Sequence, residues 1–217
     1  MTATAGFVGQ EAFKLRHDVA AMVPGPVERV LDVGCGPGLT GAALREVGVA
    51  EVWGLERDVE LAEAARSQLD HVVCGDLDGA SVELPDGQFD GLIYADVLEH
   101  LVDPWSVLRE QRRLLRSGGF AILSIPNVRN LRVLAPLLLR GEWRYTAEGI
   151  MSIGHLRFFT TKSMRRLLHG AGYRIVDERA NYSPRGRLVG RLSLGLLDDL
   201  VAEQRLFLAR PVVGTDG

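Results

Sequence analysis

The chain has 217 residues, of which 47% are hydrophobic and 24% are charged, and its formal net charge is −3. The composition is that of an ordinary globular protein. The slightly negative net charge argues against nucleic acid or an anionic membrane as a partner. No apolar stretch reaches the roughly 18 residues of a membrane span. Two cysteines, Cys35 and Cys74, are too few for a disulfide framework and fit a reducing cytoplasm.

Predicted strands and helices alternate along the chain, which favours an α/β fold with a parallel sheet and helices on both faces. We expect a single domain over residues 1–217, with an N-terminal segment over 1–27 that contains a helix and no signal peptide. The predicted helices are Gln10–Val23, Leu39–Val47, Val59–Leu69, Pro104 to about Arg116, and Thr161–Ala171. The predicted strands are Arg29–Val33, Glu51–Leu55, His71–Cys74, Phe89–Ala95, Phe120–Ile125, Tyr173–Arg179 and Arg205–Val212, with a turn at Ser117–Gly119. Asp58 and Asp103 are placed to cap the helices that follow them.

An insertion over residues 126–159 interrupts this alternation. Insertions of that length in a compact domain are usually functional, so we predict a lid or an acceptor-binding loop after the fifth strand. Its apolar stretch Leu131–Leu139 is short and contains Pro136, which indicates a loop helix and not a membrane span. The fold of Ser183–Glu203 has no clear pattern.

A glycine-rich loop follows the first predicted strand. Residues 32–38 read Asp-Val-Gly-Cys-Gly-Pro-Gly and lead into a predicted helix. Glycines let the backbone turn tightly and approach a ligand, which lies at the carboxyl ends of parallel strands. The spacing is G-x-G-x-G, and Leu39 stands where a dinucleotide-binding loop has its third glycine. A nicotinamide enzyme is therefore the least favoured alternative.

Acidic residues end three successive predicted strands. Glu56 can accept hydrogen bonds from both hydroxyls of a ribose. Asp76 is placed to accept from an adenine amino group, and Asp32 suits an ammonium better than a pyrophosphate. S-adenosylmethionine carries an ammonium and a sulfonium, so the three acids together predict it as the cofactor. The alternative is that each acid serves only a cap or a turn.

Several segments together resemble the class I methyltransferases: residues 30–38, 54–56, 75–77, 89–90, 96–104 and 114–119. The match covers about residues 28–180 and is closest to the branch of the ubiquinone-biosynthesis and sugar-pathway methyltransferases. The resemblance implies a Rossmann-like, seven-stranded, mostly parallel sheet with its last strand antiparallel. It implies cofactor contacts at Asp32, Gly34, Gly36, Glu56, Asp76 and Leu77, to which we add Cys35, Gly38, Arg57 and Ala95 as candidates.

A second cluster of chemically active residues follows the fourth predicted strand. If residues 96–100 form one helical turn, Asp96, Glu99 and His100 share a face, and such a set can hold a divalent cation. With the later His155, the set resembles the E-x-x-E-H site of metal-dependent ubiquinone-pathway O-methyltransferases and of small-RNA 2′-O-methyltransferases. Two departures stand out: Asp96 is one methylene shorter than the family's glutamate, and residues 151–154 hold no acid.

Three hypotheses stay open for these residues. Glu99, His100 and His155, with Asp96 as a further ligand, could bind Mg²⁺ or another divalent cation. His155 or His100 could instead act as a metal-free general base. The third hypothesis assigns them structural roles. The aromatic residues Trp143, Tyr145, Phe158 and Phe159 either line an acceptor pocket or form the insertion's own small core.

The sequence predicts an O-methyltransferase that acts on a small hydroxylated molecule, a sugar or a phenolic intermediate. The alternatives are an N-methyltransferase on a small amine, an RNA 2′-O-methyltransferase, suggested by eight arginines between Arg109 and Arg144, and a non-catalytic cofactor-binding module. Net charge and the lack of an RNA-binding module argue against nucleic acid. We expect no membrane partner. Oligomeric state is open, although Leu192–Leu200 could pack against a partner.

Overall fold

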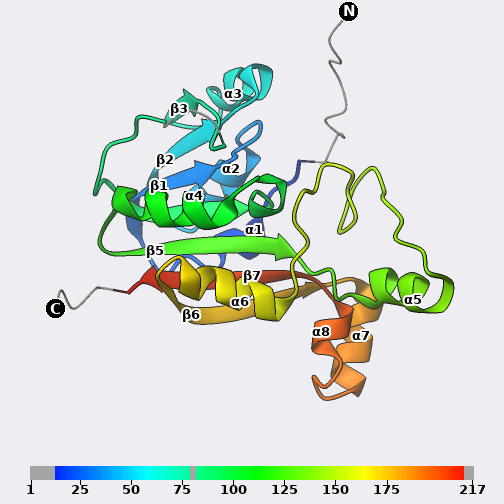
Figure 1. Ribbon diagram of the computed structural model, residues 1–217. Coiled ribbons are helices and arrows are strands. Elements are labelled where there is room, and N and C mark those ends of the chain that lie inside the picture. Colours follow the sequence, from blue (N-terminus) through cyan, green and yellow to red (C-terminus); the bar gives the residue numbers. More distant parts are fainter. Residues whose placement is uncertain (1–12, 79–81, 213–217) are drawn as a thin grey trace, which may run out of the picture.

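The computed structural model describes residues 13–78 and 82–212. Its centre is a seven-stranded sheet with the order β3-β2-β1-β4-β5-β7-β6 (Figure 1). The strands are β1 (Val27–Val33), β2 (Val49–Glu56), β3 (His71–Cys74), β4 (Phe89–Ala95), β5 (Leu115–Pro126), β6 (Tyr173–Tyr182) and β7 (Ala202–Pro211). Strand β7 is antiparallel to β5 and β6, and the other neighbouring pairs are parallel. The predicted mixed sheet, with its last strand antiparallel, is confirmed.

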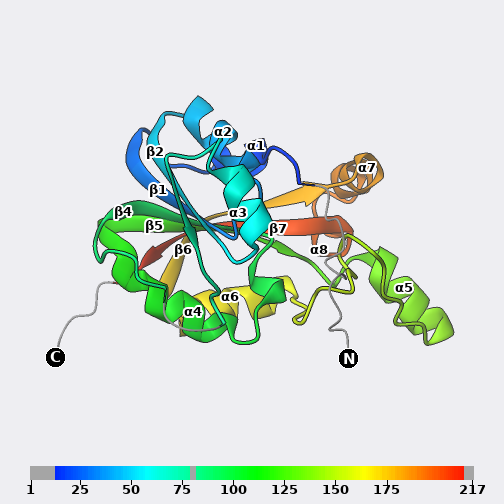
Figure 2. The same cartoon turned by 90° about the horizontal axis from the view of Figure 1, so that it is seen from above.

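Helices cover both faces of this sheet (Figure 2). They are α1 (His17–Ala20), α2 (Leu39–Glu46), α3 (Val59–Ala65), α4 (Pro104–Gln111), α5 (Leu131–Arg140), α6 (Thr161–Gly170), α7 (Pro184–Leu192) and α8 (Asp198–Val201), with 3₁₀ turns η1 (Leu98–His100) and η2 (Arg112–Leu114). None of the helices in the described part of the chain has the length and apolar character needed to span a bilayer.

Two apolar layers hold the helices against the sheet. Val30 of β1 packs in one layer with Leu44 of α2, whereas Leu31 packs in the other with Leu108 of α4 and Leu168 of α6. Side chains of a strand alternate between its two faces, so a central strand that is covered on both sides needs a continuous apolar run. In β1 the exception to that run is Asp32, which is buried with its neighbours.

Local capping sets where several helices begin. The Asp58 side chain accepts from the backbone of Glu60 and Leu61 at the start of α3, and Asp103 accepts from Ser106 at the start of α4, where Pro104 is the first helical residue. Such caps satisfy backbone N–H groups that the first helical turn leaves unpaired. Both predicted caps are confirmed.

Some predicted element boundaries are wrong. The opening helix is shorter than Gln10–Val23: α1 covers only His17–Ala20, and residues 10–12 lie outside the described residues. The reason is Arg16, which has non-helical backbone angles and extends its side chain into the interior. Helix α3 ends at Ala65 and not at Leu69. The turn predicted at Ser117–Gly119 is instead the early part of β5, whose register against β4 shifts there.

The two segments that are least regular in sequence lie on the same side of the molecule. Residues 126–159 contain α5 followed by turns and two isolated bridges, and their lid function stays a prediction. Residues 183–203 form α7, α8 and the start of β7.

Candidate active site

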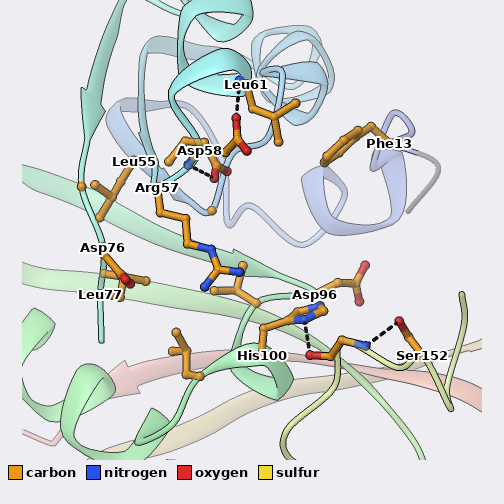
Figure 3. A pocket seen from close by; sticks show the side chains of 16 residues that line it. Phe13, Leu55, Arg57, Asp58, Leu61, Asp76, Leu77, Asp96, His100 and Ser152 are labelled. Carbon is orange, nitrogen blue, oxygen red and sulfur yellow. Dashed lines mark hydrogen bonds between the residues drawn. The ribbon is translucent and has the colours of Figure 1, made fainter. Parts of the chain in front are cut away.

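A cavity of about 220 Å³ lies at the carboxyl ends of the first four strands (Figure 3). Strands β1 and β4 are neighbours there, and the chain connections leave them in opposite directions, which is where open α/β sheets bind ligands. The cavity is lined by residues at or just after the ends of β1, β2, β3 and β4: Gly34, Glu56, Arg57, Asp76, Leu77 and Asp96. The sheet topology thus brings motifs that are distant in the sequence to one edge of the sheet, around the cavity.

The glycine loop is held tightly at this mouth. Gly34 has φ +68°, and a Cβ on it would lie 2.7 Å from Val97. Gly36 has φ +53°, and a Cβ there would lie 2.5 Å from the Phe13 ring. The Gly36 amide donates to Glu56 Oε2 at 2.9 Å. Both positions require glycine, and Glu56 anchors the loop in addition to any role toward a ligand.

Asp32 lies next to the loop and has one carboxylate oxygen without a hydrogen-bond donor in the described part of the chain. Its residue is 1% exposed, and its Oδ2 accepts no hydrogen bond from the described part of the chain. Burial raises the pKa of Asp32 to about 7; nearby Arg16 opposes the rise, and Glu56 adds to it. A buried carboxylate without a donor is costly. The position therefore fits a cationic group supplied by a ligand.

The remaining cofactor candidates divide into two sets. Gly34, Glu56, Arg57, Asp76 and Leu77 line the cavity, whereas Asp32, Cys35, Gly36, Gly38 and Ala95 do not. Arg57 extends its guanidinium into the cavity (Figure 3). Glu56 Oε1 accepts from the Asp58 amide at 2.9 Å, and Asp76 Oδ1 accepts from the Asp78 amide at 3.0 Å. Both Glu56 and Asp76 therefore also stabilise the turn that follows them.

The prediction that Asp96 shares a helical face with Glu99 and His100 is wrong. Asp96 has φ +59°, and the 3₁₀ turn begins only at Leu98. The Asp96 carboxylate forms an ion pair with Arg16 and accepts from Gln204 Nε2 at 2.6 Å. A left-handed backbone at the end of β4 turns this carboxylate toward the buried arginine.

Glu99, His100 and His155 converge without Asp96. Each offers one potential ligand atom, and these atoms lie within 4.8 Å of one another. Glu99 is 1% exposed and His155 is 5% exposed, whereas His100 lines the cavity. The backbone amides of Leu156 and Arg157 donate to the Glu99 carbonyl at 2.8 and 2.9 Å, which brings the late histidine to η1.

Hydrogen bonds to the backbone orient both imidazoles. His100 Nδ1 lies 3.0 Å from the Gly154 carbonyl, and His155 Nδ1 lies 3.1 Å from the Ile150 carbonyl. A carbonyl only accepts, so Nδ1–H donates in both cases, and in the neutral imidazole the lone pair is then on Nε2. This is the arrangement in which a histidine serves as a metal ligand or accepts a proton.

Aromatic side chains of the insertion lie beside His155. Its ring centroid is 6.3 Å from that of Phe158, which in turn packs against Trp143 at 5.2 Å and Tyr145 at 6.1 Å. Trp143 is 40% exposed and Tyr145 is 49% exposed, so the group is packed on one side and open on the other.

Sequence reasoning missed several residues of this site. Phe13 and Ser152 line the cavity, and Arg16 is buried between Asp96 and Asp18. Arg16 lies 80 positions from Asp96 in a segment without a motif, so its role follows only from the folded structure. Lys14, His17 and Asp18 surround it in the sequence, so no local signal singles out Arg16.

Comparison with known proteins identifies the family. Residues 7–178 match the model of a methyltransferase domain family. The chain belongs to this family of class I methyltransferases. The match covers most of the chain and includes every element that builds the cavity.

Two curated relatives of this methyltransferase domain are ubiquinone biosynthesis O-methyltransferases. One, from Xanthomonas campestris, is 38% identical over 116 residues, which cover 50% of this chain and 47% of the relative, so the chain spans about half the length of that protein. The other, from Cereibacter sphaeroides, is 30% identical over 176 residues, which cover 78% of this chain and 70% of the relative. Among solved structures, an S-adenosylmethionine-dependent methyltransferase from Mesorhizobium loti is 21% identical with a TM-score of 0.62 and covers 89% of this chain and 95% of that one. That likeness concerns the fold.

Proposed function

We propose that the protein is an S-adenosylmethionine-dependent O-methyltransferase for a small hydroxylated acceptor, a phenol or a sugar. The family and the fold support methyl transfer from this cofactor. O-methylation is the activity in the names of its curated relatives. When bound, the cofactor supplies an electrophilic methyl group, so the protein mainly has to bind and orient both partners.

The residues around the cavity fit this cofactor. Asp32, buried and without a donor for Oδ2 in the described chain, would hold the ammonium of the methionine moiety. Glu56, which lines the cavity at the end of β2, would accept from the ribose hydroxyls, and Asp76 from the adenine amino group. The left-handed glycines Gly34 and Gly36 allow close approach of the backbone.

The observation that carries the O-methylation proposal is the convergence of Glu99, His100 and His155 beside this cavity. A hydroxyl acceptor must lose its proton, whereas an amine needs only a lone pair. One carboxylate and two imidazoles with lone pairs on Nε2 suit a divalent cation, which when bound would lower the pKa of the acceptor hydroxyl. The same lone pair on His100, which lines the cavity, could take the proton directly.

The aromatic group of the insertion supports an acceptor with a flat surface. Phe158, Trp143 and Tyr145 lie next to His155 and keep an open side. Aromatic faces stack on phenolic rings and on the apolar faces of sugars. Their position next to the proposed proton-accepting groups would orient a hydroxyl toward them.

The test measures methyl transfer to catechols, vicinal-diol sugars, amines and short RNA, with Mg²⁺ and with EDTA. We expect transfer to a diol or catechol that EDTA abolishes and that Glu99→Gln and His155→Gln each reduce by about 100-fold or more. Glu60→Gln, on the exposed start of α3, is the matched control. Titration with Mn²⁺ should show one site in the unmodified protein and none in Glu99→Gln.

Binding of S-adenosylhomocysteine separates the parts of the proposal. Glu99→Gln and His155→Gln should bind it as the unmodified protein does. Transfer that EDTA leaves intact would refute the cation and leave His100 as the base. Transfer to an amine alone would refute O-methylation, and binding of NAD in place of S-adenosylhomocysteine would refute the cofactor.

A further inference from the structure

Helix α5 and the α7–α8 segment lie on one side of the molecule (Figures 1 and 2), and both carry highly exposed leucines. On α5, Leu138 is 79% exposed and Leu139 is 83% exposed. In the other segment Leu192, Leu194 and Leu196 are 77%, 92% and 88% exposed. We refer to these five residues as the leucine surface. Clustered apolar side chains that are this exposed mark an interaction site more often than single exposed leucines do.

Polar contacts hold the two elements next to each other. Asn130, the N-cap of α5, donates to the Ala202 carbonyl at 2.9 Å, directly after α8. Arg129 forms an ion pair with Asp199 of α8. The start of α5 is therefore held next to α8.

Arginines accompany the leucine surface. Arg185, Arg187 and Arg191 lie on α7, are exposed, and form no ion pair with the residues that the structure describes. On α5, the Arg140 guanidinium lies 4.0 Å from the Glu142 carboxylate. The acid next to α7 that forms no ion pair in the described structure is Asp198 of α8, so three arginines outnumber it on a chain whose net charge is −3.

The charge distinguishes two possible occupants of the surface. In a symmetric dimer the same patch meets itself, so the three α7 arginines of one copy would approach those of the other. Asp198 of α8 lies next to α7, but one such acid per copy does not balance three arginines. A lipid bilayer with anionic headgroups complements them instead. Guanidinium groups bind phosphates in bidentate fashion, and arginine stems can lie along apolar surface while their charge stays in water.

We propose that the leucine surface docks on the headgroup region of an anionic lipid bilayer. The leucines enter the boundary between headgroups and acyl chains, and Arg185, Arg187 and Arg191 bind lipid phosphates. Such contacts lie in the plane of the interface, and no segment crosses the bilayer. Attraction of this kind falls with ionic strength, because exposed charges are screened. The proposal is independent of which acceptor is methylated.

The test is sedimentation of the purified full-length protein with vesicles. We expect binding to vesicles that contain phosphatidylglycerol, little binding to pure phosphatidylcholine, and release by about 0.5 M NaCl. Replacing Leu192, Leu194 and Leu196 together by serine should weaken binding by about tenfold or more. Replacing Arg185, Arg187 and Arg191 by glutamine should weaken it to a similar extent and remove the salt dependence.

A matched control uses equally exposed apolar residues elsewhere. Val59 is 72% exposed on α3 and Val102 is 57% exposed before α4, and the pair Val59→Ser and Val102→Ser should bind vesicles normally. Circular dichroism checks that each variant keeps its fold. Equal vesicle binding by the leucine and control variants would overturn the proposal. So would an absence of vesicle binding together with a dimer, measured by light scattering, that the serine replacements dissociate.

Discussion

Asp32 offers a direct test of the cofactor site, because its protonation is linked both to folding and to ligand binding. Burial raises its pKa from the ordinary 3.8 to about 7. Between these two values the folded state binds more protons than the unfolded state, so the contribution of this carboxyl to stability is largest below about pH 4 and falls as the pH rises toward 7. A shift of about three pKa units corresponds to about 4 kcal/mol in the free energy of unfolding.

Asp32→Asn removes this titration and keeps the shape of the side chain. Relative to the unmodified protein, the free energy of unfolding of the cofactor-free variant should rise by about 4 kcal/mol between pH 4 and pH 8. Urea unfolding at several pH values measures this difference. Carboxyls elsewhere in the chain titrate in both proteins, so their effects cancel.

Asp70→Asn is a control with the opposite sign. Burial works against ionisation of Asp70, but hydrogen bonds from the Val52 amide and Arg45 outweigh it and lower the pKa of Asp70. Its contribution to stability is present at neutral pH and is lost as the pH falls through the lowered value. Asp70→Asn should therefore be less stable than the unmodified protein at pH 7, with the difference vanishing in acid.

Ligand binding provides the second half of the test. An ammonium placed against Asp32 favours the carboxylate, so affinity for S-adenosylhomocysteine should rise from pH 6 to pH 8 with release of a proton. Asp32→Asn should bind about 10- to 100-fold more weakly at pH 8, with no such rise. Parallel stability curves for the two proteins would refute the raised pKa, and equal affinities at pH 8 would refute the ammonium contact.

Two further substitutions test the frame of the site. Gly34→Ala should lower the free energy of unfolding by about 1–3 kcal/mol and weaken S-adenosylhomocysteine binding, because φ is +68° and the added Cβ would lie 2.7 Å from Val97. Calorimetry measures both effects. The control Gly87→Ala, with φ +64° and open space around the added Cβ, should lose less stability and keep its affinity for S-adenosylhomocysteine. Arg16→Met should lower the free energy of unfolding by about 3–5 kcal/mol, because it leaves the Asp96 carboxylate without its cation. Urea unfolding measures this loss, and a smaller loss in an Asp96→Asn background would support the pair, whereas identical losses would contradict it.

The sheet was predictable because its signals are local. The first four strands each contain a short apolar run bounded by turn residues, and β3 and β4 match their predicted bounds. The acids Asp32, Glu56 and Asp76 follow such runs, so a parallel sheet brings them to one edge whatever the helices do. The β5 boundary was less predictable, because the strand contains the glycine pair that usually marks a turn.

The geometry after β4 depends on a contact that no local pattern encodes. Helical spacing places Asp96 with Glu99 and His100, but pairing with Arg16, 80 residues earlier, favours a left-handed backbone at Asp96. A non-glycine residue in that region costs on the order of 1 kcal/mol, which the buried ion pair and the Gln204 hydrogen bond offset. The candidate metal ligands therefore fall from four to three because of a contact between segments that are distant in the sequence.

The arginines of α7 show that net charge, a property averaged over the chain, does not describe the charge that a partner meets locally. Net charge argues against an anionic partner only when the charges are evenly spread, because exposed charges act over about 8–10 Å at physiological ionic strength. In this chain Arg129 and Arg132 are paired with acids, whereas the arginines of α7 form no ion pair in the described structure. A lipid phosphate next to α7 would therefore meet three arginines and one nearby acid, Asp198, whereas the more distant acids that make the net charge negative are screened from it.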